Sequence, residues 1–138
     1  MTNKPKNKGT AAETAVLRYV QANGFPDAYR KTLSGNKDGG DIQLNPNTII
    51  EVKNYELPTG FPSEGQVAKW MDELETELRN SGNPVGILVV KRPRRGSPAD
   101  WFCFHHTELF IVDAWLPPRW SSPIVACSRF GDAIEAIR

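Results

Sequence analysis

The chain has 138 residues, of which 39% are hydrophobic and 24% charged, and its formal net charge is +1. This length and composition predict one globular domain that buries a core without disulfides or a structural metal. No apolar run could span a bilayer, and the polar N-terminus lacks the apolar core of a signal peptide. We expect a single domain over residues 9–138, a flexible basic tail over residues 1–8, and a cytoplasmic location in a bacterial or phage-infected cell.

Charge is distributed unevenly along the chain. Residues 1–37 hold seven Lys or Arg against two acids, residues 38–78 hold two against nine, and residues 79–138 hold eight against five. An acidic middle between basic ends is compatible with a divalent-cation site framed by phosphate-binding surface. Ordinary solvated faces explain the same pattern, because no segment is strongly basic.

The first predicted element is a helix over residues 10–23. Thr10 precedes Glu13 at the spacing of a capping box, apolar residues then recur at helical spacing, and Gly24 is suited to end the helix.

A β-hairpin is predicted next, after a strand at residues 28–33 and a polar loop. Its strands are residues 41–44 and 48–53, joined by a turn at residues 45–47. Alternation along the hairpin predicts a buried face formed by Ile42, Leu44, Ile50 and Val52. The opposite face would then expose Asp41, Glu51 and Lys53 together.

The sequence from residue 63 onward predicts a further alternation of helices and strands. Ser63 is expected to cap a helix over residues 64–80, and the apolar run at 85–90 predicts a strand buried on both faces. The remaining expected elements are a basic turn at 91–98, a strand at 101–104, a strand or helix at 109–116, a strand at 124–127 and a helix at 132–137. The order α-β-β-β-α-β predicts an α/β fold with a mixed central β-sheet flanked by helices.

The informative chemical pattern is Gly40-Asp41 followed by Glu51-Val52-Lys53. Two carboxylates on one face of a hairpin can coordinate Mg²⁺, with Mn²⁺ as a substitute, and the Val52 carbonyl is a further candidate ligand. Such a cation neutralises phosphate charge and lowers the pKa of water. Lys53 would project from the same strand face and could orient the attacking water or stabilise transition-state charge. Glu13 could reach the site from the first helix. A Glu-x-Lys pair alone more often means only a surface ion pair.

These residues resemble the core motif of the PD-(D/E)xK nuclease superfamily. The stretch from Lys8 to Glu13, with Gly24-Phe25, Arg30 and Ser34-Gly35, is similar to archaeal Holliday junction resolvases and their phage and bacterial relatives. The resemblance covers roughly residues 8–91. It implies a restriction-endonuclease-like core and a metal site formed by Glu13, Asp41, Glu51 and Lys53. It also implies DNA contacts by the basic and serine residues Lys8, Arg30, Lys31, Ser34 and Lys37.

The chain departs from these resolvases at two positions: Gly40 replaces the usual proline, and Thr14 replaces a common arginine. Gln66 resembles a catalytic glutamine of restriction-type and RecB-like members, although a helix-surface role is equally compatible with the sequence. The basic turn could bind phosphates through Lys91, Arg92, Arg94 and Arg95, or be a solvated loop. We assign no role to His105 and His106, and we expect reduced cysteines at Cys103 and Cys127.

The resemblance implies a Mg²⁺-dependent endodeoxyribonuclease acting on branched DNA, with a four-way junction as the first candidate substrate. Symmetric cutting of two strands favours a homodimer. Two alternatives remain open: a restriction-type or exonuclease enzyme of the same superfamily, and a DNA-binding module that does not cleave.

Overall fold

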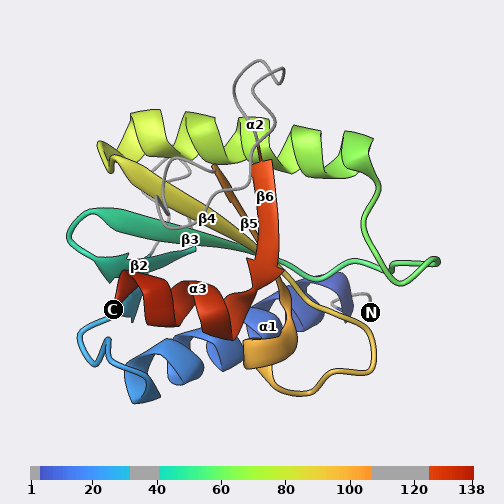
Figure 1. Ribbon diagram of the computed structural model, residues 1–138, viewed down its shortest axis with the longest axis horizontal. Coiled ribbons are helices and arrows are strands. Elements are labelled where there is room, and N and C mark those ends of the chain that lie inside the picture. Colours follow the sequence, from blue (N-terminus) through green and yellow to red (C-terminus); the bar gives the residue numbers. More distant parts are fainter. Residues whose placement is uncertain (1–3, 32–40, 107–124) are drawn as a thin grey trace.

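The computed structural model describes residues 4–31, 41–106 and 125–138. A six-stranded mixed sheet separates two helical layers, with α2 on one face and α1 and α3 on the other (Figure 1). The predicted α/β fold with a mixed central sheet flanked by helices is therefore confirmed. The elements in chain order are α1 (Lys4–Ala22), β1 (Tyr29–Arg30), β2 (Ile42–Asn45), β3 (Thr48–Lys53), α2 (Glu64–Ser81), β4 (Val85–Val90), a 3₁₀ turn (Pro98–Asp100), β5 (Phe102–His106), β6 (Val125–Arg129) and α3 (Phe130–Ile137).

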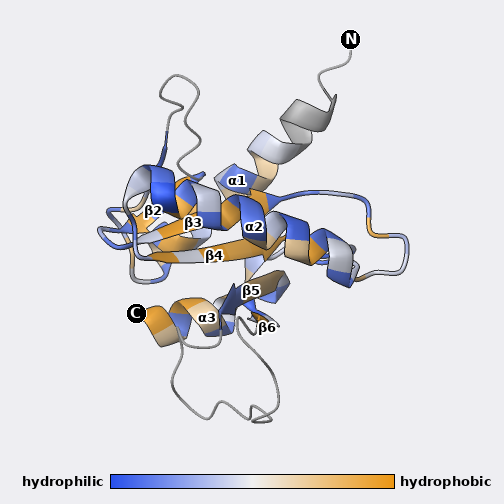
Figure 2. Cartoon of the chain, turned by 90° about the horizontal axis from the view of Figure 1, so that it is seen from above, coloured by the Kyte–Doolittle hydropathy of each residue, from blue (hydrophilic) through white to orange (hydrophobic). Residues whose placement is uncertain are grey.

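The strands follow one another across the sheet in sequence order. Only β3 and β4 pair in parallel among the described strands, whereas their neighbours pair antiparallel. A parallel pair requires a crossover connection, and α2 forms that crossover. The hydrophobic strand β4 lies between α2 and α3 (Figure 2).

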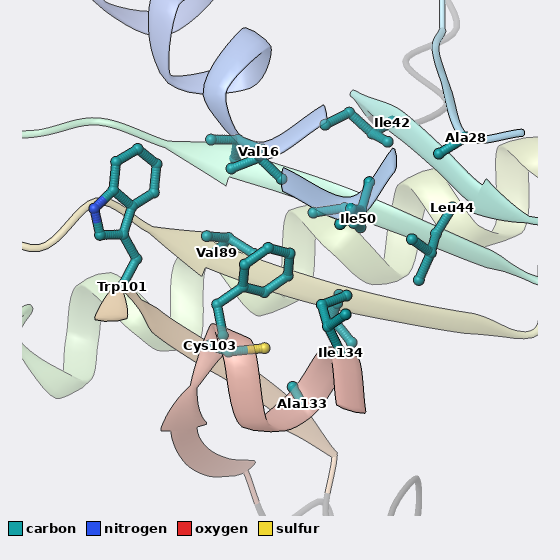
Figure 3. Close-up of a cluster of buried hydrophobic side chains, with 14 of the residues drawn as sticks. Val16, Ala28, Ile42, Leu44, Ile50, Val89, Trp101, Cys103, Ala133 and Ile134 are labelled. Atoms are coloured by element: carbon teal, nitrogen blue, oxygen red, sulfur yellow. The ribbon is translucent and has the colours of Figure 1, made fainter. Parts of the chain in front are cut away.

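Two hydrophobic clusters hold the layers together. On the α1 and α3 face, Val16 and Ile134 pack with strand residues such as Ile50 and Val89 (Figure 3). On the α2 face, the cluster consists of Ile49, Val67, Trp70, Met71, Leu74, Leu88, Val90 and Phe104. The predicted buried face of the hairpin, formed by Ile42, Leu44, Ile50 and Val52, is confirmed.

The first helix begins six residues before its predicted start. α1 begins at Lys4, so the capping box expected at Thr10 is wrong, and residues 4–8 of the expected tail are helical. Pro5 is compatible with this early start, because proline is tolerated in the first turn of a helix. The predicted end is confirmed: Gly24 has a φ of 107°, and the Phe25 N–H donates to the Val20 carbonyl at 3.0 Å.

Other boundaries differ by smaller amounts. β1 contains only two residues of the predicted strand, paired with Gln43 and Ile42 of β2. β3 and β4 have their predicted bounds, and Ser63 caps α2 by accepting a hydrogen bond from the Gln66 N–H at 3.2 Å. The strand or helix expected at 109–116 lies outside the described residues.

Candidate functional site

Asp41, Glu51 and Lys53 lie on the same side of the hairpin. Alternation along β3 directs Glu51 and Lys53 away from the cluster that contains Ile50 and Val52. Asp41 precedes β2, and its N–H donates to the Ile50 carbonyl at 3.1 Å, which continues the antiparallel pairing by one position. The grouping of these three residues, predicted from alternation, is therefore present in the structure.

This face is covered, whereas the sequence predicted that it would be exposed. The side chain of Glu51 lies beneath α2, and the residue is only 5% exposed. The expectation of an exposed face is wrong because the crossover helix between the two parallel strands packs on this side. The alternating pattern of the hairpin does not indicate which layer will cover each face.

α2 runs antiparallel to β3, and successive side chains of the two elements meet in register. The rings of Tyr55 and Trp70 have centroids 5.2 Å apart. One step further, Lys53 Nζ lies 3.2 Å from Glu73 Oε1. The next contact joins Glu51 to Glu77, whose carboxyl groups share a hydrogen bond.

We refer to Asp41, Glu51 and Glu77 as the carboxyl cluster. Glu77 is 4% exposed, so two of its three members are buried. Sequence reasoning missed Glu77, although its spacing from Trp70 and Leu74 places it on the apolar stripe of α2. An acid on such a stripe is a signal that it has a buried partner.

The carboxyl cluster strongly favours a neutral Glu51. Burial, the hydrogen bond with Glu77 and the negative charge of Asp41 together raise the pKa of Glu51 from 4.5 to about 12. Burial lowers the pKa of Lys53, whereas the hydrogen bond with Glu73 and the negative charge of that carboxylate raise it. Lys53 Nζ lies 3.9 Å from Glu51 Oε1. Lys53 is therefore held as a cation beside the cluster.

The backbone next to the cluster is also ordered. Asp41 Oδ2 accepts a hydrogen bond from the Val52 N–H at 2.7 Å, where the partner strand ends. The Asp41 carbonyl accepts one from the Lys31 N–H at 2.9 Å. The Asp41 carboxylate is thus fixed against β3. The role of the Val52 carbonyl as a ligand stays a prediction.

The donor atoms of the cluster suit a hard cation such as Mg²⁺, which prefers carboxylate oxygens. Oε2 of Glu51 is buried and receives no hydrogen bond from a donor group of the described residues. A cation beside this atom would favour the ionised carboxylate. Within residues 4–31, 41–106 and 125–138, however, no three His, Cys, Asp or Glu side chains are arranged to hold a metal ion. Asp41 and Glu51 therefore fit as two ligands of a set that needs further oxygen donors.

Glu13 lies on the opposite helical layer. α1 packs on the sheet face of Ile50 and Val52, and Glu13 Oε1 forms an ion pair with Arg30 Nε at 3.4 Å. Arg30 also donates to Thr14 Oγ1 at 2.6 Å. Glu13 and Arg30 thus form a second charged group, and a ligand role for Glu13 stays a prediction.

Gln66 lies in the first turn of α2, half-buried and two helical turns before Glu73. A catalytic role for this glutamine stays a prediction. Among the expected DNA contacts, Ser34, Lys37 and the side chain of Lys8 lie outside the described residues. His105 is buried, which lowers its pKa, and its Nδ1 lies 3.1 Å from the His106 carbonyl.

The basic turn after β4 is held in place by aromatic residues. Lys91 Nζ lies 5.7 Å from the centre of the Trp101 ring, and the Arg92 guanidinium lies 5.2 Å from that of Phe102. Trp101 Nε1 donates to the Arg95 carbonyl at 2.8 Å. Arg94 has a φ of 63°, the only positive φ of a non-glycine residue in the described part of the chain.

Comparison of the chain with family models, curated proteins and solved structures found no significant match. No helix among the described residues has both the length and the apolar character needed to cross a membrane.

We predict that Glu51→Gln stabilises the protein at neutral and alkaline pH in the presence of EDTA. Because the pKa of Glu51 is raised from 4.5 to about 12, folding takes up a proton between these values and the free energy of unfolding falls as pH rises. Glutamine retains the neutral shape without this dependence. We expect the unfolding temperature of Glu51→Gln to exceed that of the wild type by an amount that grows from pH 4.5 to pH 9. Glu75→Gln, an exposed change on the same helix, should show the same pH dependence as the wild type. Parallel curves for Glu51→Gln would contradict the prediction.

We also predict that Arg94→Gly retains or raises stability, whereas Arg94→Val lowers it. Left-handed backbone costs a side-chain-bearing residue about 1 kcal/mol, and glycine avoids this cost. Urea unfolding measures the difference, and Arg95→Gly in the same turn is the control expected to destabilise. Equal decreases in the free energy of unfolding for Arg94→Gly and Arg95→Gly would refute backbone strain at Arg94.

Proposed function

We propose that this chain is a metal-dependent endodeoxyribonuclease with a restriction-endonuclease-like core. The observation that carries the proposal is the placement of Asp41, Glu51 and Lys53 on one side of a hairpin, with a cationic Lys53 3.9 Å from Glu51. Carboxylates can hold a cation at a phosphodiester, and a lysine beside them can stabilise the negative charge that develops during hydrolysis.

Each residue would have a distinct task. Asp41 and Glu51 would hold Mg²⁺, which supplies charge neutralisation at the phosphate and acidifies water when bound. Lys53 would orient the attacking water or stabilise negative charge that develops at phosphorus. Asp41 is already fixed by the Val52 N–H, so it needs little reorganisation. Lys53 has to leave Glu73 to reach a phosphate, and the Glu73 side chain is 43% exposed, so this ion pair is weak.

The proposed substrate class rests on the resemblance of residues 8–91 to Holliday junction resolvases. We propose branched DNA, with a four-way junction first, cleaved in the cytoplasm by a homodimer whose two sites cut symmetric strands. Lys91 and Arg92 directly follow β4, whose last residue pairs with Lys53, and they would bind the phosphate backbone. Arg30, Lys31, Arg94 and Arg95 remain candidates for further contacts.

The first test is cleavage of a labelled four-way junction and a linear duplex in Mg²⁺. We expect Asp41→Ala and Lys53→Ala each to lower the cleavage rate by about 10²-fold or more. Lys69→Ala, an exposed lysine of α2, should leave the rate unchanged. Undiminished cutting by both site variants would overturn the mechanism. Equal cutting of the two substrates would remove junction specificity alone.

A second candidate function is a DNA-binding module that does not cleave. The burial of Glu51 and its hydrogen bond with Glu77 favour it, since a protonated Glu51 is a poor cation ligand.

Calorimetric titration with Mg²⁺ separates the two candidates. The nuclease predicts saturable binding that Asp41→Ala abolishes and Glu75→Ala retains. Binding of DNA without binding of Mg²⁺ would favour the module.

A further inference from the structure

A pocket of about 400 Å³ lies at the carboxyl ends of the parallel strands β3 and β4. One wall is the segment from Asn54 to Pro58, directly after Lys53, and the other is the segment from Lys91 to Pro93. The Lys91 N–H donates to the Lys53 carbonyl at 2.9 Å, which ties the two walls together. The carboxyl ends of parallel strands are a common place for ligands in α/β sheets. The pocket therefore adjoins the lysine of the proposed site.

Tyr55 supplies an aromatic surface to this pocket. It is 55% exposed although its ring packs on Trp70, with centroids 5.2 Å apart. Trp70 is buried in the hydrophobic cluster on the α2 face, so its ring holds one side of the Tyr55 ring in place. A supported but exposed ring offers a stacking face at little entropic cost.

Two cations line the opposite wall in defined positions. The Phe102 ring lies against Arg92, and the Trp101 ring lies against Lys91. Trp101 also anchors the turn through the Arg95 carbonyl. Against these two cations the pocket has a single carboxylate, that of Glu56, so its charge favours an anion. Asn54 adds an amide that can both donate and accept hydrogen bonds.

We propose that this pocket binds one nucleotide of the DNA strand beside the scissile phosphate. The base would stack on Tyr55, and the phosphate would bind Arg92 and Lys91. A nucleotide combines a planar base with an anionic phosphate, and the pocket combines an aromatic wall with a cationic one. Its volume of about 400 Å³ is in the size range of small-ligand pockets. The choice of DNA as the ligand rests on the proposed function. An accessible base also implies an unpaired nucleotide, as at a branch point or a frayed end.

The test is binding of thymidine 5′-monophosphate, thymidine and inorganic phosphate to the full chain in EDTA, followed by amide chemical shifts in NMR. We expect the nucleotide to bind about tenfold more tightly than either part alone. Tyr55→Ala and Arg92→Ala should each weaken nucleotide binding about tenfold, whereas Tyr55→Phe should retain it. Tyr29→Ala is a matched control, since Tyr29 is 56% exposed at the far edge of the sheet. Arg18→Ala controls for the loss of an exposed arginine.

Asp41→Ala distinguishes this inference from the proposed function. The variant should bind the nucleotide as the wild type does while it loses cleavage. Nucleotide binding without cleavage by the wild type would support the pocket and refute the nuclease. Cleavage with no binding of the nucleotide, or with equal binding of nucleotide and phosphate, would overturn the pocket and leave the nuclease standing. Shift changes confined to residues outside the pocket would also overturn it.

Discussion

β3 and β4 pair in parallel over six positions, from Thr48–Val85 to Lys53–Val90, and a parallel pair cannot be joined by a tight turn. The connection has to cross one face of the sheet, and here α2 does so, packing Trp70 and Leu74 against β4 and its neighbours. The hydrophobic contact of α2 with the sheet is therefore the interaction on which the site depends. It covers the face that carries Glu51 and Lys53, and it brings Glu73 and Glu77 to them.

Burial under α2 changes the chemistry of Glu51. A carboxylate at this position faces a second buried carboxyl group and the charge of Asp41, so the protonated form of Glu51 is favoured. The same group thus links the two candidate functions. In the proposed nuclease Glu51 would lose its proton and help to hold a cation, whereas in a module without catalysis it would keep the proton. Lys53 Nζ lies 3.9 Å from Glu51 Oε1 in the structure.

The parallel pair also explains the position of the pocket. The loops that leave β3 and β4 begin side by side, because both strands end at the same edge of the sheet. The acidic middle of the chain thereby meets the basic turn of its last third. Folding thus brings the segment after Lys53 next to Lys91 and Arg92, although these residues lie far apart in the sequence.

The sequence alone determined much of the local structure. Alternation along the hairpin placed Asp41, Glu51 and Lys53 on one face, and local signals identified the cap at Ser63 and the helix end at Gly24. These features depend on residues close in the chain. Only the tertiary structure decided that α2 covers Glu51, that Glu77 is its partner and that the segments after Lys53 and Val90 form one pocket. Each of these depends on which strands pair and on which face of the sheet the crossover helix covers. The alternation of apolar and polar residues along one strand does not indicate which helix packs on either face.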